Sequence, residues 1–144
     1  MDVAAIPFNR LLGLRSDGDA LKLPADPNYH NHLGAVHATA QFGLAEAASG
    51  QWLLSRFGAK AADHIAVVRR AEAKFRRPAE GELSAEADGA PLEVERFLDT
   101  LSRRGRATLE VHVRLVDGGG NVTLEASFEW FAQRVARDTA SSSQ

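Results

Sequence analysis

Residues 38–55 constrain the fold most, because this helix-length segment carries a single charged residue, Glu46. A surface helix normally places a charged face opposite an apolar stripe. Here small and apolar residues occupy nearly every position, so we expect a helix that is buried on most sides. A carboxylate on such a helix is unfavourable unless it is paired or used chemically. Glu46 is therefore the first candidate for a functional residue, and a glutamate that simply reaches solvent is the alternative.

The composition is that of a globular protein and excludes several classes of function. Of the 144 residues, 44% are hydrophobic and 25% are charged, and the formal charge of −2 gives no general attraction to nucleic acid or membranes. There is no cysteine, which excludes disulfides, thiolate nucleophiles and cysteine-ligated zinc. The N-terminus lacks the pattern of a secretory signal, and the polar residues within 38–55 argue against a membrane span. We expect a soluble, cytoplasmic protein with neither nucleic acid nor membrane as a partner.

The hydrophobic pattern of the rest of the chain predicts an α+β fold. The segments expected from their periodicity and turn residues are, in chain order, a short helix or irregular lead-in at 3–12, a hairpin within 12–23, a loop at 24–35, the long helix to about 56, strands at 64–77 and 81–87, a helix at 92–104, and strands at 108–115 and 122–130. Together they predict an antiparallel β-sheet wrapped around a central long α-helix. We expect one domain over 1–135 and a disordered tail over 136–144.

The start of the central helix offers a second chemical feature. Around His37, Ala38 and Thr39 the backbone N–H groups have no partner within the helix and lie at the positive end of its dipole. Such a terminus can polarise a carbonyl oxygen that is becoming an oxyanion. Glu46 lies 46 − 37 = 9 residues further on, about two and a half turns. It therefore cannot share one carbonyl with the start of its own helix, but across a two-fold axis it could face the start of a partner's helix.

Other polar residues have both a structural and a functional interpretation. The His37 side chain can cap the helix or carry a proton. His30 and His32 resemble a metal-binding pair, but no further ligand follows at a suitable spacing, so we predict no metal site. A basic cluster can hold phosphates or form a solvated strand face. Its members are Arg69, Arg70, Lys74, Arg76, Arg77, Arg103, Arg104 and Arg106. The sequence contains no Gly-x-Ser-x-Gly, P-loop or dinucleotide-binding motif.

The residues around the helix start resemble a motif of the hotdog-fold acyl-CoA thioesterases, in particular the phenylacetyl-CoA thioesterase type. In that family an Asn-x-x-Gly-x-x-His-Gly-Gly motif enters the central helix, and an acidic residue follows nine positions after the histidine. Asn31, Gly34 and His37 match the motif, and Glu46 falls on the acidic position. The Arg-Arg-Pro-Ala segment at 76–79, followed by Gly81, resembles the family's strand ending in Pro-Ala-x-x-Gly, and the final strands around a glycine-rich turn are similar to the family as well.

The resemblance implies a hotdog fold and hydrolysis of an acyl thioester at an interface between subunits of a homodimer or tetramer. The Ala38 N–H would polarise the thioester carbonyl, Glu46 would act as general base or nucleophile, and Asn31 would orient the thioester or the water. The thiol would be coenzyme A or an acyl-carrier phosphopantetheine, as substrate, and no cofactor is implied. The other residues expected at the site are His37 and, for substrate binding, Gly34, Thr39, Phe42, Arg76, Arg77 and Arg104.

Departures from the family pattern leave other functions open. Ala38 and Thr39 stand where the family has two glycines, and the expected strand at 64–77 has no Ser or Thr, although many relatives carry a hydroxyl there. The alternative function is a non-catalytic hotdog module that binds an acyl-CoA or a fatty acyl group. A hotdog hydratase or dehydratase ranks lower, because the His-Phe-Pro-Gly-type loop of such enzymes is absent.

Overall fold

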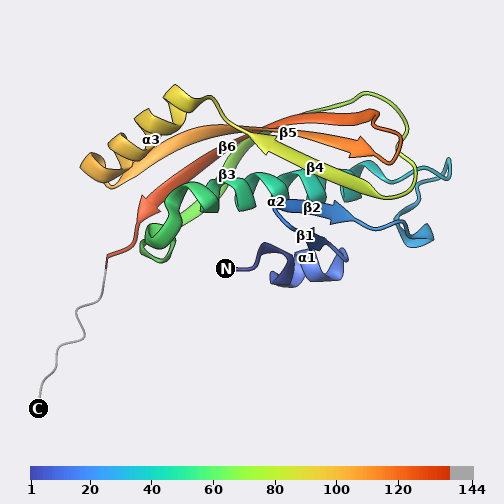
Figure 1. Cartoon of the computed structure of the whole chain (residues 1–144), viewed down its shortest axis with the longest axis horizontal. Coiled ribbons are helices and arrows are strands. Elements are labelled where there is room, and N and C mark those ends of the chain that lie inside the picture. Colours follow the sequence, from blue (N-terminus) through green and yellow to red (C-terminus); the bar gives the residue numbers. More distant parts are fainter. Residues whose placement is uncertain (137–144) are drawn as a thin grey trace, which may run out of the picture.

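The computed structural model describes residues 1–136, which form one curved sheet and three α-helices (Figure 1). The elements are η1 (Val3–Ala5), α1 (Pro7–Leu11), β1 (Arg15–Asp17), β2 (Ala20–Leu23), η2 (Pro27–Tyr29), α2 (Ala38–Phe57), η3 (Gly58–Asp63), β3 (His64–Phe75), β4 (Leu83–Asp88), α3 (Pro91–Arg104), β5 (Arg106–Asp117) and β6 (Val122–Arg134). The tail expected at 136–144 lies outside the described residues, apart from its first residue.

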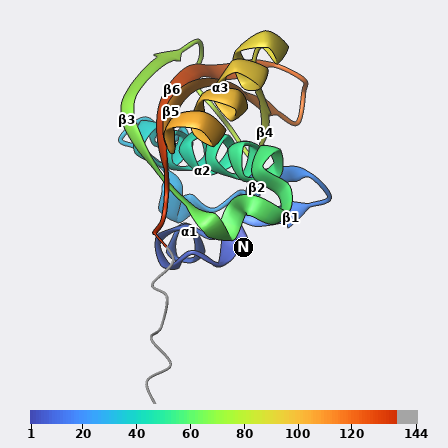
Figure 2. The same ribbon diagram turned by 90° about the vertical axis from the view of Figure 1, so that its left-hand side faces the viewer.

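The six strands form a single antiparallel sheet in the order β1-β2-β4-β5-β6-β3. Viewed end on, the sheet curves around α2 (Figure 2). This is the α+β arrangement that the hydrophobic pattern predicts and the hotdog fold that the family resemblance implies, with α2 as its central helix. Within the described chain β3 pairs only with β6, so this 12-residue strand forms a long free edge of the sheet.

The core lies between α2 and the concave face of the sheet. Alternate residues of β5 and β6 point into it, as their sequence periodicity predicts, and the most deeply buried of them are Val111, Val113, Leu115, Leu124 and Phe128. Both strands extend beyond the predicted segments, because their pairing continues to Arg106 opposite Gln133. The helix predicted at 92–104 is α3, and Gly105 ends it with a φ of 73°, a conformation that glycine adopts without strain.

The small residues of α2 are sites where other parts of the same chain pack closely. A Cβ added to Gly43 would lie 2.6 Å from Cδ2 of Leu12, which follows α1. A Cβ added to Gly50 would lie 3.2 Å from the Trp130 ring of β6. The Gly and Ala content of α2 therefore allows the N-terminal segment (residues 1–12) and β6 to approach the helix backbone.

Ser49 fixes the position of the Trp130 ring beside α2. Its side chain is fully buried, and its Oγ accepts a hydrogen bond of 2.9 Å from the Trp130 indole N–H while donating to the Glu46 carbonyl oxygen at 2.7 Å. The indole N–H has no other partner in the described chain. The only polar atom of the Trp130 side chain is thus satisfied on the helix side, and the rest of the ring is apolar.

We expect Ser49→Ala to lower the free energy of unfolding by about 1–3 kcal/mol, because it leaves a buried indole N–H without an acceptor. Ser55→Ala is the matched control. Ser55 also donates to a carbonyl oxygen three residues earlier in α2, but its side chain is exposed, so we expect a change within about 0.5 kcal/mol. Urea denaturation of both variants measures the difference, and equal effects would contradict the role given to the indole hydrogen bond.

Candidate active site

The loop that leads into α2 is shaped by Asn31. Its Oδ1 accepts hydrogen bonds from the backbone N–H groups of Leu33, at 2.9 Å, and Ala35, at 3.1 Å. Its own N–H donates to the Ala35 carbonyl oxygen at 2.8 Å. Gly34 lies in this turn with a φ of 77°, where a side chain would be strained. Asn31 and Gly34 therefore fix the path of the chain towards the helix start, and Asn31 has only its amide NH₂ left for a ligand.

His37 is the N-cap of α2. Its Nδ1 accepts a hydrogen bond of 3.0 Å from the Thr39 N–H, which is the capping role that the sequence leaves open beside proton transfer. The next residue, Ala38, is exposed, and its N–H makes no hydrogen bond within residues 1–136. The helix dipole adds positive potential at this point. The Ala38 N–H is therefore free to donate to an anionic oxygen.

Residues after β3 hold the start of α2 in place. The Val36 N–H donates to the Ala79 carbonyl oxygen at 2.8 Å, and Ala79 is completely buried. A second link runs through Gln41, whose Nε2 donates to the Val36 carbonyl oxygen at 3.1 Å and whose Oε1 accepts from the Thr123 hydroxyl at 3.3 Å. These hydrogen bonds hold in place the segment that carries the free Ala38 N–H.

Glu46 lies in the middle of α2 with its side chain partly buried. Its carboxylate has no hydrogen-bond or ion-pair partner in the part of the chain that the structure describes. Burial raises the pKa of this carboxyl above its ordinary value, because an apolar environment disfavours the charged form. An unpaired, partly desolvated carboxylate of raised pKa is a stronger base than a solvated one.

The free N–H of Ala38 and the carboxylate of Glu46 are too far apart in one chain to act on one carbonyl group. They are 46 − 38 = 8 residues apart on the same helix, which corresponds to about 12 Å along its axis. Reacting groups in an active site must lie within hydrogen-bonding distance of the same substrate atoms. A single chain therefore carries both chemical groups but does not bring them together.

The raised pKa of Glu46 predicts a pH-dependent gain in stability on Glu46→Gln. A carboxyl whose folded-state pKa exceeds its unfolded-state value contributes stability below the unfolded value and loses this contribution as the pH rises through the folded value. Glutamine stays neutral throughout. We expect the variant to melt at a higher temperature than wild type at pH 7, and the difference to shrink as the pH falls towards the ordinary value of 4.5. Thermal denaturation across this range measures it, and a wild type more stable than the variant at pH 7 would reveal a partner for the carboxylate.

A cavity of about 470 Å³ opens beside Glu46. It is lined by residues of the N-terminal segment, α2, η3, β3 and Trp130 of β6. The sequence predictions missed the contributions of Val3, Asn9 and Trp130, because they come from distant parts of the chain. The apolar residues within 3–12 were the available signal, since a short apolar segment at the start of a chain must cover some part of the core.

Phe42 and Thr39, both expected to bind substrate, lie on the first two turns of α2. Thr39 is exposed. The Phe42 ring packs against Phe128 with a centroid distance of 5.4 Å, and 36% of the residue remains accessible. Phe42, Glu46 and Gly50 are spaced four residues apart, so they follow one face of the helix. This face therefore joins the helix start to the cavity.

The three arginines expected to bind phosphates do not lie together. Arg76 lies near the start of β6, because its backbone N–H donates to the Thr123 carbonyl oxygen. Arg104 ends α3 near the other end of β6, where the Arg134 N–H donates to the Gly105 carbonyl oxygen. The 134 − 123 = 11 residues between these points correspond to about 35 Å of strand. The Arg76 guanidinium also pairs with Glu125. Within one chain, Arg104 cannot bind the same phosphate groups as Arg76 and Arg77.

The described part of the chain contains neither a metal-binding cluster nor a helix that could cross a membrane. No group of three or more His, Asp or Glu residues between positions 1 and 136 is placed to hold a metal ion. None of the helices in the same range is long and apolar enough to cross a membrane.

Comparison with known proteins identifies relatives of the fold and of the sequence. The family described as "Domain of unknown function (DUF4442)" matches residues 9–132. None of the curated proteins matches. A protein of unknown function from Pseudomonas aeruginosa, called a probable thioesterase, is 27% identical, with a TM-score of 0.80 and coverage of 92% of this chain and 91% of that chain.

Two further solved structures share the fold at lower identity. A Bacillus halodurans protein solved with CoA is 20% identical, with a TM-score of 0.70 and coverage of 89% of this chain and 76% of its own. A thioesterase from Haemophilus influenzae is 15% identical, with a TM-score of 0.71 and coverage of 95% of this chain and 90% of its own. The chain therefore has the fold of thioesterase-superfamily proteins, and the relatives do not single out phenylacetyl-CoA.

Proposed function

This chain belongs to the family described as Domain of unknown function (DUF4442), and we propose that it hydrolyses acyl-CoA thioesters with Glu46 as the catalytic carboxylate. The observation that carries the proposal is an unpaired, partly buried carboxylate in the middle of the central hotdog helix, at the edge of an apolar cavity. Structural neighbours called thioesterases support the same reaction class. The fold alone does not define an activity, so the proposal rests on this carboxylate and on the free N–H at the helix start.

In the proposed reaction Glu46 accepts a proton from a water molecule while the oxygen of that water forms a bond to the thioester carbon. The carbonyl oxygen becomes an oxyanion, which the Ala38 N–H and the α2 dipole stabilise. The tetrahedral intermediate collapses as its carbon–sulfur bond breaks. The leaving thiolate takes the proton from Glu46, so the products are a carboxylic acid and a thiol and the enzyme is regenerated.

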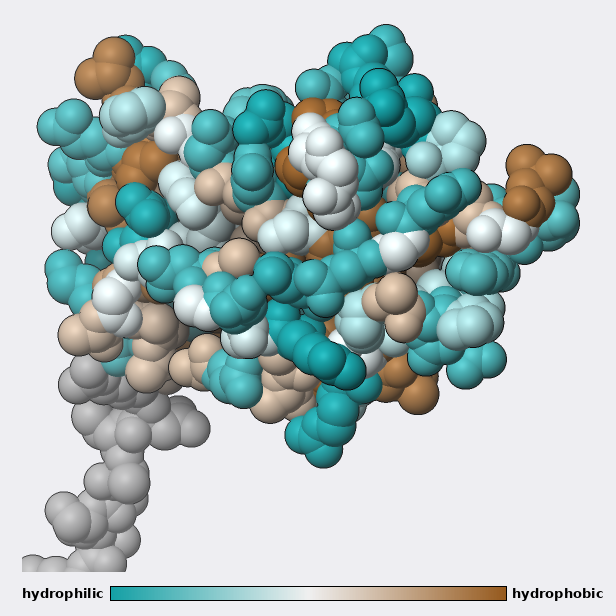
Figure 3. Space-filling view, turned by 45° about the vertical axis from the view of Figure 1, so that its right-hand side comes forward, coloured by the Kyte–Doolittle hydropathy of each residue, from teal (hydrophilic) through white to brown (hydrophobic). Residues whose placement is uncertain are grey.

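The proposal requires at least two copies of the chain, because the 12-residue β3 edge is unpaired in the described chain and the two reactive groups of α2 are far apart. Ile65, Val67 and Phe75 expose 58%, 54% and 46% of their surface along this edge. Exposed apolar edge strands pair with other strands. By contrast, the face in Figure 3 is largely hydrophilic, with apolar residues in small scattered groups. Pairing of β3 with the β3 of a second copy would continue the sheet and bring the two α2 helices side by side.

Coenzyme A is the proposed thiol, because the Bacillus halodurans neighbour was solved with CoA. Arg77 is the best placed of the expected arginines to bind its phosphates. It is exposed and follows β3 on the side of the α2 start, whereas Arg76 is already paired with Glu125. An acyl-carrier phosphopantetheine would present the same thioester to Glu46, so the choice of thiol changes the binding surface and leaves the chemistry unaltered.

The test is an assay of thiol release from short, medium, long and aromatic acyl-CoAs. We expect turnover of at least one of them by the wild-type protein. Failure to hydrolyse any of them, combined with a rise in melting temperature on adding acyl-CoA, would favour the alternative of a binding module, which the Ala38-Thr39 sequence in place of two glycines also suggests. Failure in both experiments would refute both functions.

A further inference from the structure

The residues that line the cavity beside Glu46 follow α2, and we call this cavity the channel. Glu46 and Gly50 line it at one end, and Leu53 and Leu54 line it further along the helix. The 54 − 46 = 8 residues between the first and last of these correspond to about 12 Å. Ala62 of η3 lies at the far end of this path, beyond the end of α2. The carboxylate therefore lies at one end of an elongated space.

The walls of this channel offer few polar atoms to a ligand. The Trp130 indole N–H is bonded to Ser49, and the amide NH₂ of Asn9 donates to the Val3 carbonyl oxygen at 2.9 Å. His64 Nδ1 is 2.9 Å from the Lys60 carbonyl oxygen. The remaining lining is almost entirely apolar. Apart from the Glu46 carboxylate at its end, the channel is therefore suited to a hydrocarbon chain.

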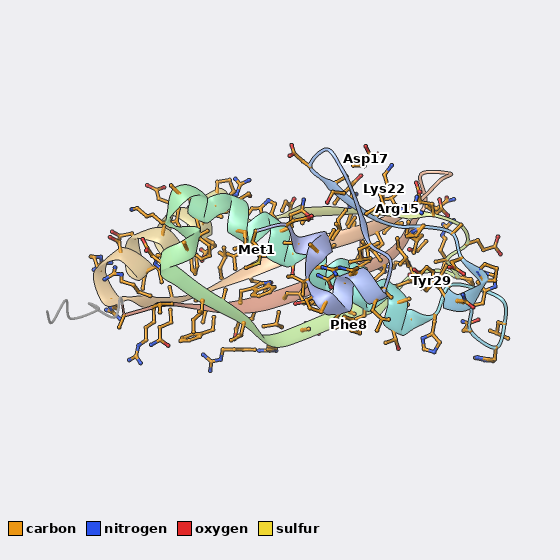
Figure 4. All side chains as sticks on the ribbon, turned by 90° about the horizontal axis from the view of Figure 1, so that it is seen from below. Met1, Phe8, Arg15, Asp17, Lys22 and Tyr29 are labelled. Carbon is orange, nitrogen blue, oxygen red and sulfur yellow. The ribbon has the colours of Figure 1, made fainter. Side chains whose placement is uncertain are left out.

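The N-terminal segment forms one wall of the channel and is firmly attached to α2. Val3 is buried, and the Asn9 hydrogen bond ties η1 to α1. Leu12 packs on Gly43, which anchors the segment next to the helix backbone. Figure 4 shows the N-terminal segment, with Met1 and Phe8 labelled, lying across α2. The wall is thus an ordered part of the fold and can limit what enters the channel.

We propose that this channel holds the acyl chain of the substrate, with the thioester at Glu46 and the chain end at Ala62, and that it selects linear acyl groups of medium length. This inference rests on the proposed function, and it adds the substrate class and the residues that determine it. A chain of about 12 Å fills the path from Glu46 to the end of α2. Shorter acyl groups leave apolar surface uncovered and therefore bind less well.

The first test fills the far end of the channel. We expect Ala62→Phe to lower the ratio of kcat/KM for octanoyl-CoA to kcat/KM for butyryl-CoA by about tenfold or more, since losing space for one or two methylenes has effects of this size. Ala59→Phe is the matched control, because Ala59 and Ala62 are both exposed residues of η3 but only Ala62 lines the channel. We expect the control to leave the ratio unchanged. An unchanged ratio in Ala62→Phe would overturn the proposal.

The second test detects the acyl chain without turnover. Trp130 lines the channel and the other tryptophan, Trp52, does not, so Trp52→Phe leaves one fluorescent reporter in the wall. We expect ω-bromo-octanoic acid, a contact quencher, to quench Trp130 in this variant and to leave Trp52 unquenched in Trp130→Phe. Ala62→Phe in the Trp52→Phe background should weaken the quenching.

The outcomes separate this inference from the proposed function. Quenching of Trp130 without hydrolysis of any acyl-CoA would support the channel as the acyl-binding site and refute the proposed hydrolase activity. The opposite result is hydrolysis that Glu46→Gln abolishes, with no quenching of Trp130 and an unchanged chain-length ratio in Ala62→Phe. This result would support the hydrolase activity and overturn the acyl-binding role of the channel. Side chains of a second copy would then fill its space.

Discussion

Glu46→Gln is expected to lower kcat for acyl-CoA hydrolysis by about 10²–10⁴-fold, the contribution typical of a positioned general base. The amide has nearly the same size and shape as the carboxyl but cannot accept a proton from water. The same substitution is expected to raise the melting temperature at pH 7, because it removes a partly buried charge that has no partner in the described chain. A loss of activity together with a gain in stability would separate a chemical role of Glu46 from a structural one.

The control for this prediction is Glu95→Gln. Glu95 is an exposed glutamate of α3, so its replacement removes one negative charge from a surface away from the site and should leave kcat unchanged. In the wild type the rate should fall as the pH drops through the raised pKa of Glu46, because only the charged carboxylate accepts a proton. A Glu46→Gln variant that keeps the wild-type rate would show that Glu46 is not the catalytic carboxylate.

The sequence predicts the elements of this fold well because each has a strong local signal. The single charge within 38–55 identifies both the buried helix and its unusual residue. Clear two-residue alternation identifies β5 and β6, and Pro91 with Gly105 marks the ends of α3. These signals depend on neighbours within a few positions, so tertiary contacts are not needed to interpret them.

The surroundings of Glu46 could not be predicted in the same way, because they depend on contacts between distant residues. Gly43 and Gly50 carry no side chain, and in the folded chain Leu12 and Trp130 pack against these positions. The wall supplied by the N-terminal segment has the same origin. The pairing of whole strands and the packing of the N-terminal segment decide which segments meet at α2.

The basic cluster shows the same limit. Arg76, Arg77 and Arg104 resemble one phosphate-binding set when only their charges in the sequence are considered. The structure separates Arg104 from the other two, because β6 runs between the turn near Arg76 and the strand end near Arg104. Charge composition therefore predicts that basic side chains are available, whereas the topology decides which of them can act together.

Ala38→Pro is expected to lower kcat by about 10²–10³-fold, the effect of removing one donor to an oxyanion. Proline removes the N–H proposed to stabilise the oxyanion but is well tolerated at the first position of a helix. The preceding residue, His37, already has the extended ψ of 138° that a following proline favours. The helix start should therefore keep its structure, and far-ultraviolet circular dichroism and the melting temperature check this.

Combining the two inactive variants in one dimer tests whether the site is shared between subunits. A heterodimer of Ala38→Pro and Glu46→Gln chains has one site that pairs the intact Ala38 N–H of one chain with the intact Glu46 of the other. Its second site carries both defects. If the two-fold arrangement is correct, heterodimers purified through two different tags should recover about half of the wild-type kcat per dimer. If the two groups instead act within a single chain, neither site is intact and the heterodimer stays inactive, because each chain then lacks one of the two groups.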